Sequence, residues 1–184
     1  MNRMTVKEIL REAAQMLGLD DTVAYLDGED EETKEAVQLL RCFNVVENEL
    51  ALDYLPLYAE TEIDTPSGIV LYSVLPHKIV RVLRVLDEHG EKVKYTLYPT
   101  QIKACVGKIK IAYTYAPCEK TLDESSDYQL QASKRLFAYG IAAEFLLGQG
   151  AFEQAAVWDK KYKDAITAAY QARPCKIMRS RRWA

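Results

Sequence analysis

Few side chains of this chain have the types and spacing that catalysis requires. His89 lies beside Glu88 in a stretch typical of a hairpin loop, and His77 follows Pro76 at the expected start of a strand. Either imidazole could act as a general base, but nothing in the sequence pairs it with a nucleophile, and loop histidines are usually solvated. The motifs G-x-G-x-x-G, G-x-x-x-x-G-K-[ST] and G-x-S-x-G are absent. We therefore expect no catalytic site, no cofactor and no enzymatic activity.

The four cysteines do not suggest a metal site. Cys42, Cys105, Cys118 and Cys175 are widely separated, no two of them form a C-x-x-C pair, and neither histidine lies near them at ligand spacing. We expect free thiols in a reducing compartment and no bound metal.

One carboxylate is unusual for its neighbours. Glu144 lies within the apolar run 139–147, so it could be buried with a perturbed pKa. The simpler interpretation is that it faces solvent or pairs with a basic side chain across a helix hairpin. Trp158 and Tyr162 are most simply explained as core residues between the two C-terminal helices.

The last twelve residues, 173–184, differ in composition from everything before them. They read RPCKIMRSRRWA, with five basic residues and no acidic one, and Pro174 ends the helical pattern that precedes them. Because Arg and Trp often anchor interfaces, we interpret this segment as an arm that binds a partner; the alternative is a frayed, solvated terminus. The candidate binding residues are Arg173, Lys176, Ile177, Met178, Arg179, Arg181, Arg182 and Trp183.

Charge is unevenly distributed along the chain. The net charge is -3 and residues 173–184 carry +5, so residues 1–172 carry -8. An acidic body does not suit a sequence-reading DNA-binding domain, which is normally basic. Opposite charge at the two ends would suit head-to-tail assembly or an acidic partner surface. The alternative explanation of the acidic cluster is a solvated loop followed by a helix start that acidic residues favour. The acidic cluster comprises Asp20, Asp21, Asp27, Glu29, Asp30, Glu31, Glu32 and Glu35, with Lys34 as its one cation.

Chain length and hydropathy are those of a globular protein. A mass of 21.0 kDa suffices for one domain or two small ones, and 49% of the residues are hydrophobic. No run of about 18 apolar residues could span a membrane, and the N-terminus enters an amphipathic pattern without a signal peptide.

Hydrophobic periodicity predicts helices at both ends of the chain. A capping box at Thr5 and Glu8 precedes a helix over Val6–Leu17, and an acidic loop leads to a longer helix over about residues 31–54. Helical periodicity returns at about residue 125. A Gly-Gln-Gly break near residue 149 then divides it into two helices, which are expected to form an antiparallel hairpin.

Between the helical regions the pattern becomes strand-like. The segment 79–85 is expected to be buried on much of both faces, because both of its alternating sets contain Val, Leu or Ile. A hairpin loop is expected at residues 87–90. The strands would form a small antiparallel sheet or partial barrel, and they are expected at about residues 57–63, 69–75, 79–85, 92–98 and 108–115.

The sequence as a whole predicts an α+β fold that is mainly helical. An N-terminal helix pair packs with a C-terminal antiparallel helix hairpin, a small antiparallel β region is inserted between them, and an extended arm follows. The expected divisions are residues 1–55 for the N-terminal helices, 56–118 for the β region, 119–172 for the helix hairpin and 173–184 for the arm.

Several strings resemble those of the head–tail adaptor proteins, also called neck or connector proteins, of tailed bacteriophages. They are patterns of core residues spread over most of the chain, not a catalytic signature. The clearest is YGIAAEFLLG at residues 139–148, followed by FEQAAVW at residues 152–158, Tyr162 and Ala165-Ile166. The others are VKEIL at residues 6–10, IVRV followed by DEHG at residues 79–90, and GKIKIAY followed by YAP at residues 107–117.

The resemblance implies a structural virion protein. Such adaptors form a homo-oligomeric ring, generally a dodecamer, below the portal protein, and they extend the DNA channel and present a surface to the tail or to a tail-side neck protein. It implies assembly in the host cytoplasm, a final place in the neck at the portal vertex, no membrane contact, and DNA that passes without specific binding. In that family the C-terminal segment commonly inserts against the portal, which assigns portal binding to the candidate residues of 173–184.

A regulatory nucleic-acid-binding protein is the second interpretation of the same arm. Arg179, Arg181 and Arg182 could contact phosphates, and Trp183 could stack on a base. This interpretation requires salt-dependent DNA binding, which the adaptor interpretation does not.

Overall fold

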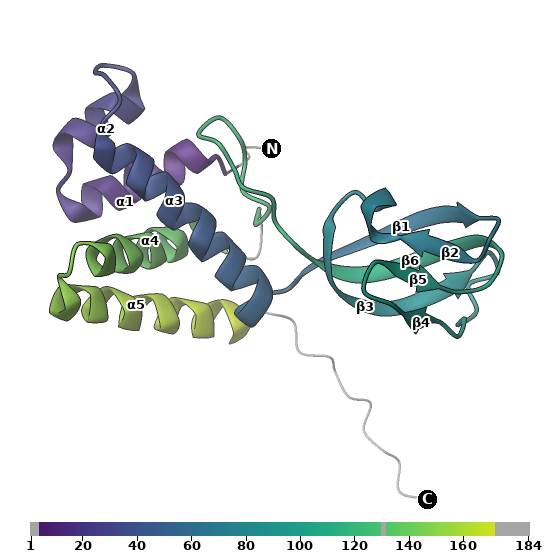
Figure 1. The fold of residues 1–184 in the computed structure, drawn as a ribbon. Coiled ribbons are helices and arrows are strands. Elements are labelled where there is room, and N and C mark those ends of the chain that lie inside the picture. Colours follow the sequence, from purple (N-terminus) through teal and green to yellow (C-terminus); the bar gives the residue numbers. More distant parts are fainter. Residues whose placement is uncertain (1–3, 130–131, 172–184) are drawn as a thin grey trace, which may run out of the picture.

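The computed structural model describes residues 4–129 and 132–171. Figure 1 shows a helical lobe built from both ends of the chain and a β lobe built from its middle. The described residues form five α-helices and two three-stranded antiparallel sheets, which confirms the α+β class.

The first helix follows its local signals closely. α1 (Val6–Leu17) begins where the Thr5 hydroxyl accepts a hydrogen bond from the Glu8 N–H, and it ends at Gly18, whose φ of 70° is the left-handed conformation that glycine adopts without strain. The predicted bounds of this helix are confirmed.

A second helix occupies part of the expected acidic loop. α2 (Asp20–Asp27) begins with two aspartates, whose charge favours a helix N-terminus, and Thr22 and Leu26, one turn apart, are buried. The expectation of a loop here was wrong, because two buried positions on one face are enough to hold a short helix against α1.

The third helix is shorter than expected. α3 (Lys34–Glu49) begins after Thr33, whose hydroxyl accepts a hydrogen bond from the Ala36 N–H, and not near residue 31. After it the chain widens into the π-helical turn η1 (Leu50–Tyr54), where the Leu55 N–H donates to the Leu50 carbonyl. This turn leads directly into the β lobe.

The last two helices lie side by side in Figure 1. They are α4 (Lys134–Gly148) and α5 (Phe152–Gln171). α4 begins after Ser133, whose hydroxyl accepts from the Leu136 N–H, so the expected start near residue 125 was wrong. Residues 124–127 instead form a non-helical segment, where the Val6 N–H of α1 donates to the Glu124 carbonyl and Glu47 of α3 accepts from Ser126 and Asp127.

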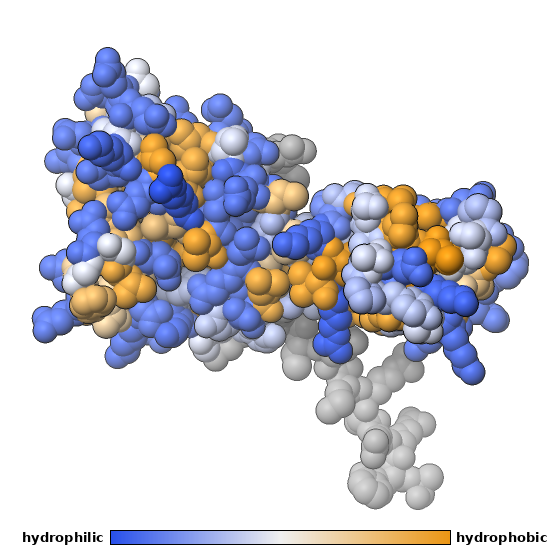
Figure 2. Space-filling view, in the orientation of Figure 1, coloured by the Kyte–Doolittle hydropathy of each residue, from blue (hydrophilic) through white to orange (hydrophobic). Residues whose placement is uncertain are grey.

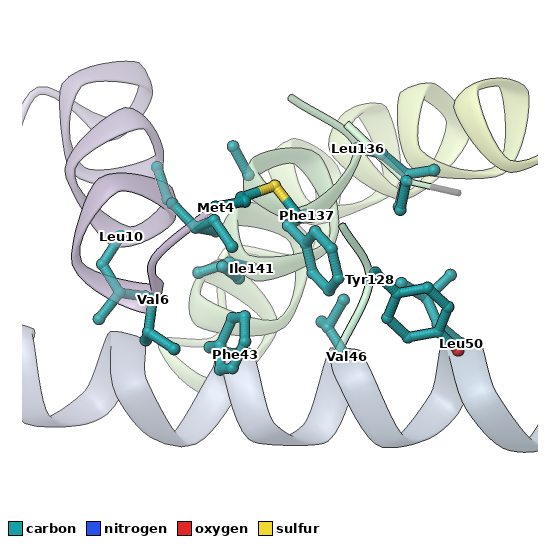
Figure 3. Packing of buried hydrophobic residues seen from close by; sticks show 14 of the residues in the cluster. Met4, Val6, Leu10, Phe43, Val46, Leu50, Tyr128, Leu136, Phe137 and Ile141 are labelled. Atoms are coloured by element: carbon teal, nitrogen blue, oxygen red, sulfur yellow. The ribbon is translucent and has the colours of Figure 1, made fainter. Parts of the chain in front are cut away.

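The core of the helical lobe joins residues from both ends of the chain. Phe137 of α4 contacts Phe43 of α3 and Tyr128, with ring centroids 5.5 and 5.9 Å apart (Figure 3). The other labelled members of this cluster come from the N-terminal segment, α1, α3, η1 and α4 (Figure 3), and are Met4, Val6, Leu10, Val46, Leu50, Leu136 and Ile141.

The β lobe has its own core between two sheets. One sheet has the order β1-β6-β3 and the other β2-β5-β4, and their inner faces bury Val70, Ile102, Ile111 and Tyr113 between them. The strands are β1 (Leu57–Thr65), β2 (Ile69–Leu71), β3 (Lys78–Asp87), β4 (Thr96–Leu97), β5 (Gln101–Lys103) and β6 (Gly107–Ala116), with the short 3-10 helix η2 (Tyr72–Val74) after β2.

Two strand predictions need correction. The strand expected over residues 92–98 is reduced to the two residues of β4, and the unexpected β5 follows it, because Pro99 turns the chain back. The strand expected over 69–75 ends at Leu71, where η2 begins.

β3 departs from the usual alternation of a strand. Its register with β6 shifts twice, which leaves Val80 and Leu83 as bulge residues. The positions that face the core therefore recur every three residues, at Ile79, Val82 and Val85. Val80 and Leu83 are 47% and 43% exposed, so the expectation that this strand is buried on both faces was wrong.

Candidate interaction surfaces

The candidate arm lies outside the described residues. This applies to Arg173, Lys176, Ile177, Met178, Arg179, Arg181, Arg182 and Trp183, and to Cys175. Its assigned role in portal binding stays a prediction.

The two histidines do not meet. His77 stacks on Tyr115 of β6, with ring centroids 4.2 Å apart, near the helical lobe. His89 is exposed in the turn after β3, and its Nε2 lies 3.5 Å from an oxygen of Glu88. Within the described ranges, no group of three or more His, Cys, Asp or Glu side chains is arranged to hold a metal ion.

Glu144 is half-buried on α4 and lies near Cys42 of α3. Burial raises the pKa of the Cys42 thiol to about 11, and the charge of Glu144 acts in the same direction. A thiol with a raised pKa is a poor nucleophile at neutral pH. Cys105 and Cys118 are also free thiols.

The two aromatic residues expected in the core differ in burial. Tyr162 is buried, and its hydroxyl donates to Glu49 Oε2 at 3.3 Å; burial raises the pKa of both groups. Trp158 is only half-buried, and Lys161 Nζ lies 4.1 Å from its ring centroid.

Polar side chains of α3 hold the chain as it returns from the β lobe. Asn44 bonds both backbone groups of Lys120, accepting from its N–H at 2.7 Å and donating to its carbonyl at 3.2 Å. Glu47 Oε1 accepts from the Ser126 hydroxyl at 2.6 Å and from the Asp127 N–H at 3.0 Å. These contacts position the end of the β lobe, and sequence reasoning missed them because both residues lie in an ordinary amphipathic pattern.

A groove on the β lobe combines apolar and basic side chains. Its volume is about 510 Å³, and Val80 and Leu97 on its walls are 47% and 51% exposed. Lys78 and Arg81, also on its walls, form no ion pair with any described residue, whereas Arg84 of the same strand binds Glu60 at 2.6 Å. We call this the β3 groove, and it is lined by Tyr72, Ser73, Lys78, Ile79, Val80, Arg81, Val82 and Leu97.

Exposed acidic side chains follow the end of α2. Asp27 binds Arg11 at 2.8 Å, but the following acidic side chains are exposed and have no cationic partner in the part of the chain that the structure describes. Val37 of α3, 36% exposed, lies a few residues further on. We call Glu29, Asp30, Glu31 and Glu32 the acidic surface.

Figure 2 shows hydrophobic atoms at the surface of both lobes, interrupted by hydrophilic side chains. No described helix has both the length and the apolar character needed to cross a membrane. Comparison with protein-family models and with curated proteins yields no match to this chain.

Proposed function

We propose that this protein is a head–tail adaptor of a tailed bacteriophage, a structural protein that forms a ring below the portal, extends the DNA channel and joins the capsid to the tail. In this proposal α4 and α5 form an antiparallel hairpin, and residues 173–184 form an extended arm that binds the portal. The protein then acts through its surfaces and not through an active site.

The observation that carries the proposal is the packing of α3, α4 and α5 around Gly140. A Cβ atom at this position would lie 2.8 Å from Val46 Cγ1 and 2.9 Å from Tyr162 Cε2, so only glycine fits without displacement. Gly140 and Tyr162 both belong to the strings that resemble adaptor proteins. Two of the residues that carry the resemblance are therefore needed for this packing of three helices. This supports the proposal that the chain shares the fold of adaptor proteins.

Two surfaces of contrasting charge add support. The β3 groove and the acidic surface belong to different lobes, and each leaves charged side chains without an ion-pair partner among the described residues. Two surfaces of different charge on one protomer suit a heterologous contact, in which one surface binds the other surface of the next copy. Such contacts form a closed ring when the rotation between neighbouring copies divides a full turn.

Size-exclusion chromatography with light scattering tests the proposal. The protein, whose mass is 21.0 kDa, is run alone and with the portal protein encoded in the same gene cluster. We expect the full chain to enter a large complex with the portal. A variant that lacks residues 173–184 should not enter it, although its circular dichroism should match that of the full chain.

The control replaces residues 173–184 with a Gly/Ser segment of equal length, which should also fail to bind. Co-elution of the truncated protein with the portal would contradict the assignment of the arm. Salt-dependent DNA binding that Arg179→Ala, Arg181→Ala and Arg182→Ala abolish, together with no portal complex, would favour the regulatory nucleic-acid-binding alternative.

A further inference from the structure

The β3 groove has the composition of a protein interface. Val80 and Leu97 expose about half of their apolar surface beside two cations, Lys78 and Arg81, that no described carboxylate neutralises. An apolar centre flanked by charged groups is the usual composition of a protein contact.

The bulges of β3 determine how a partner can bind there. A regular edge strand could add a strand from another chain, but two bulges and three basic side chains on one strand disfavour that pairing. The contact is therefore made by side chains, and its partner must offer carboxylates beside an apolar group.

The acidic surface of the same chain supplies exposed carboxylates, and α3 supplies an exposed apolar side chain, Val37, a few residues further along the chain. Glu29 and Glu31 are exposed and lack a side-chain partner in the described part of the molecule, and Val37 exposes apolar surface close by in sequence. The charge balance of the two regions is also complementary. Residues 1–55 contain 13 acidic and 5 basic side chains, whereas residues 56–118 contain 6 acidic and 8 basic ones.

We propose that the β3 groove of one copy binds the acidic surface of a second copy. β3 lies in the β lobe and α2 in the helical lobe (Figure 1), so the groove and the acidic surface belong to different lobes of one protomer. The contact is heterologous, because it joins two different surfaces. It rests on the proposed function, and it names the surfaces through which neighbouring subunits of the ring bind each other.

DNA is the less suitable occupant of the groove. Among the described residues, two cations without an ion-pair partner line it, whereas protein–DNA complexes of useful affinity neutralise on the order of 6–10 phosphates. The Val80 and Leu97 surfaces would also gain nothing from a phosphate backbone.

Charge reversal tests the contact. The groove variant carries Lys78→Glu and Arg81→Glu, and the acidic-surface variant carries Glu29→Lys and Glu31→Lys. Sedimentation velocity at high protein concentration and low salt should show that each variant alone self-associates about tenfold or more weakly than the unchanged protein. An equimolar mixture of the two variants should recover association, because alternating copies again place opposite charges together.

Matched controls separate this effect from net charge and from misfolding. Lys7→Glu with Lys160→Glu makes the same charge change at two exposed positions of the helical lobe and should leave self-association unchanged. Thermal unfolding of all variants checks that they fold. Added salt should weaken the association of the unchanged protein.

Several results would overturn the inference. They are no self-association of the unchanged protein either alone or on the portal, equal association in all variants, or no recovery in the mixture. A groove variant that loses DNA binding while its self-association is unchanged would assign the groove to nucleic acid. If charge-dependent self-association is seen but the unchanged protein does not bind the portal, the assignment to an adaptor ring fails, and the contact between two copies is retained.

Discussion

At the residue scale, the side chain with the most unusual environment is Glu47. It is 1% exposed, one of its oxygens accepts two hydrogen bonds, and the other has no partner among the described residues. Burial raises its pKa above the ordinary value of 4.5, against the opposing effect of the bonds from Ser126 and Asp127. Glu47 therefore holds the returning chain in place while its charge opposes folding at neutral pH.

Replacing Glu47 with Gln should change the pH dependence of stability. With a raised pKa in the folded state, the stability linked to the protonated carboxyl is complete below about 4.5 and is lost as the pH rises through the folded-state pKa. A glutamine does not titrate, so Glu47→Gln does not lose this stability as the pH rises. The difference in free energy of unfolding, Gln variant minus unchanged protein, should therefore increase with pH across that window. Urea unfolding from about pH 4 to about pH 8 measures the difference.

Glu47→Ala is the matched variant. Relative to Glu47→Gln, it leaves the Ser126 hydroxyl and the Asp127 N–H without an acceptor, which should cost about 1–3 kcal/mol at every pH. Parallel pH profiles for the Gln variant and the unchanged protein would show that Glu47 does not titrate differently in the folded state.

At the element scale, the close approach of α3, α4 and α5 depends on one missing side chain. Gly140 faces Val46 and Tyr162 at distances that no Cβ could occupy. The other glycine of α4, Gly148, has as its nearest neighbour Gln38 Nε2, 3.4 Å from a built Cβ, which a flexible side chain accommodates. The two glycines therefore have different reasons for their presence in one helix.

Gly140→Ala should lower the free energy of unfolding by about 1–2 kcal/mol. Overpacking costs about 1–3 kcal/mol, which exceeds the gain of up to about 1 kcal/mol in helix propensity. Gly148→Ala, which makes the same change in the same helix, should be neutral or stabilising by up to about 1 kcal/mol. Chemical denaturation of both variants measures the contrast, and equal effects would mean that the packing at Gly140 is not tight.

At the scale of the whole molecule, two cores are joined through a narrow connection. The helical core uses residues from Met4 to Leu57 and from Tyr128 to Ile166, and the β core uses residues from Val70 to Tyr113. Tyr115 contacts both. Each lobe thus buries its own apolar surface, which is the condition for folding separately.

Removal of the β lobe should leave a folded helical lobe. Tyr58 and Thr114 are register partners, so an Asn-Gly turn can replace residues 59–113 between them. The shortened chain should unfold cooperatively on heating with a strongly helical circular dichroism spectrum. A gradual, non-cooperative transition would show instead that the helical lobe needs the β lobe for its packing.

Much of the fold could be predicted where the signals are local. The cap at Thr5 predicted the bounds of α1, and alternation predicted β6 to within one residue at each end. The starts of α3 and α4 were misplaced because flanking residues with helical periodicity are held by distant partners. The β3 groove was missed, although a signal exists: basic and apolar residues each recur every three positions, at Lys78, Arg81 and Arg84 and at Ile79, Val82 and Val85.

Composition and neighbouring residues were enough to specify the α+β class, the cap at Thr5 and the unequal distribution of charge. Only the tertiary structure decided which apolar residues of β3 are exposed, because the bulges are defined by pairing with β6. It also decided that Glu47 and Asn44 hold a segment roughly 80 residues away in sequence. Such contacts form only when segments distant in sequence pack together, so no local pattern of residues predicts them.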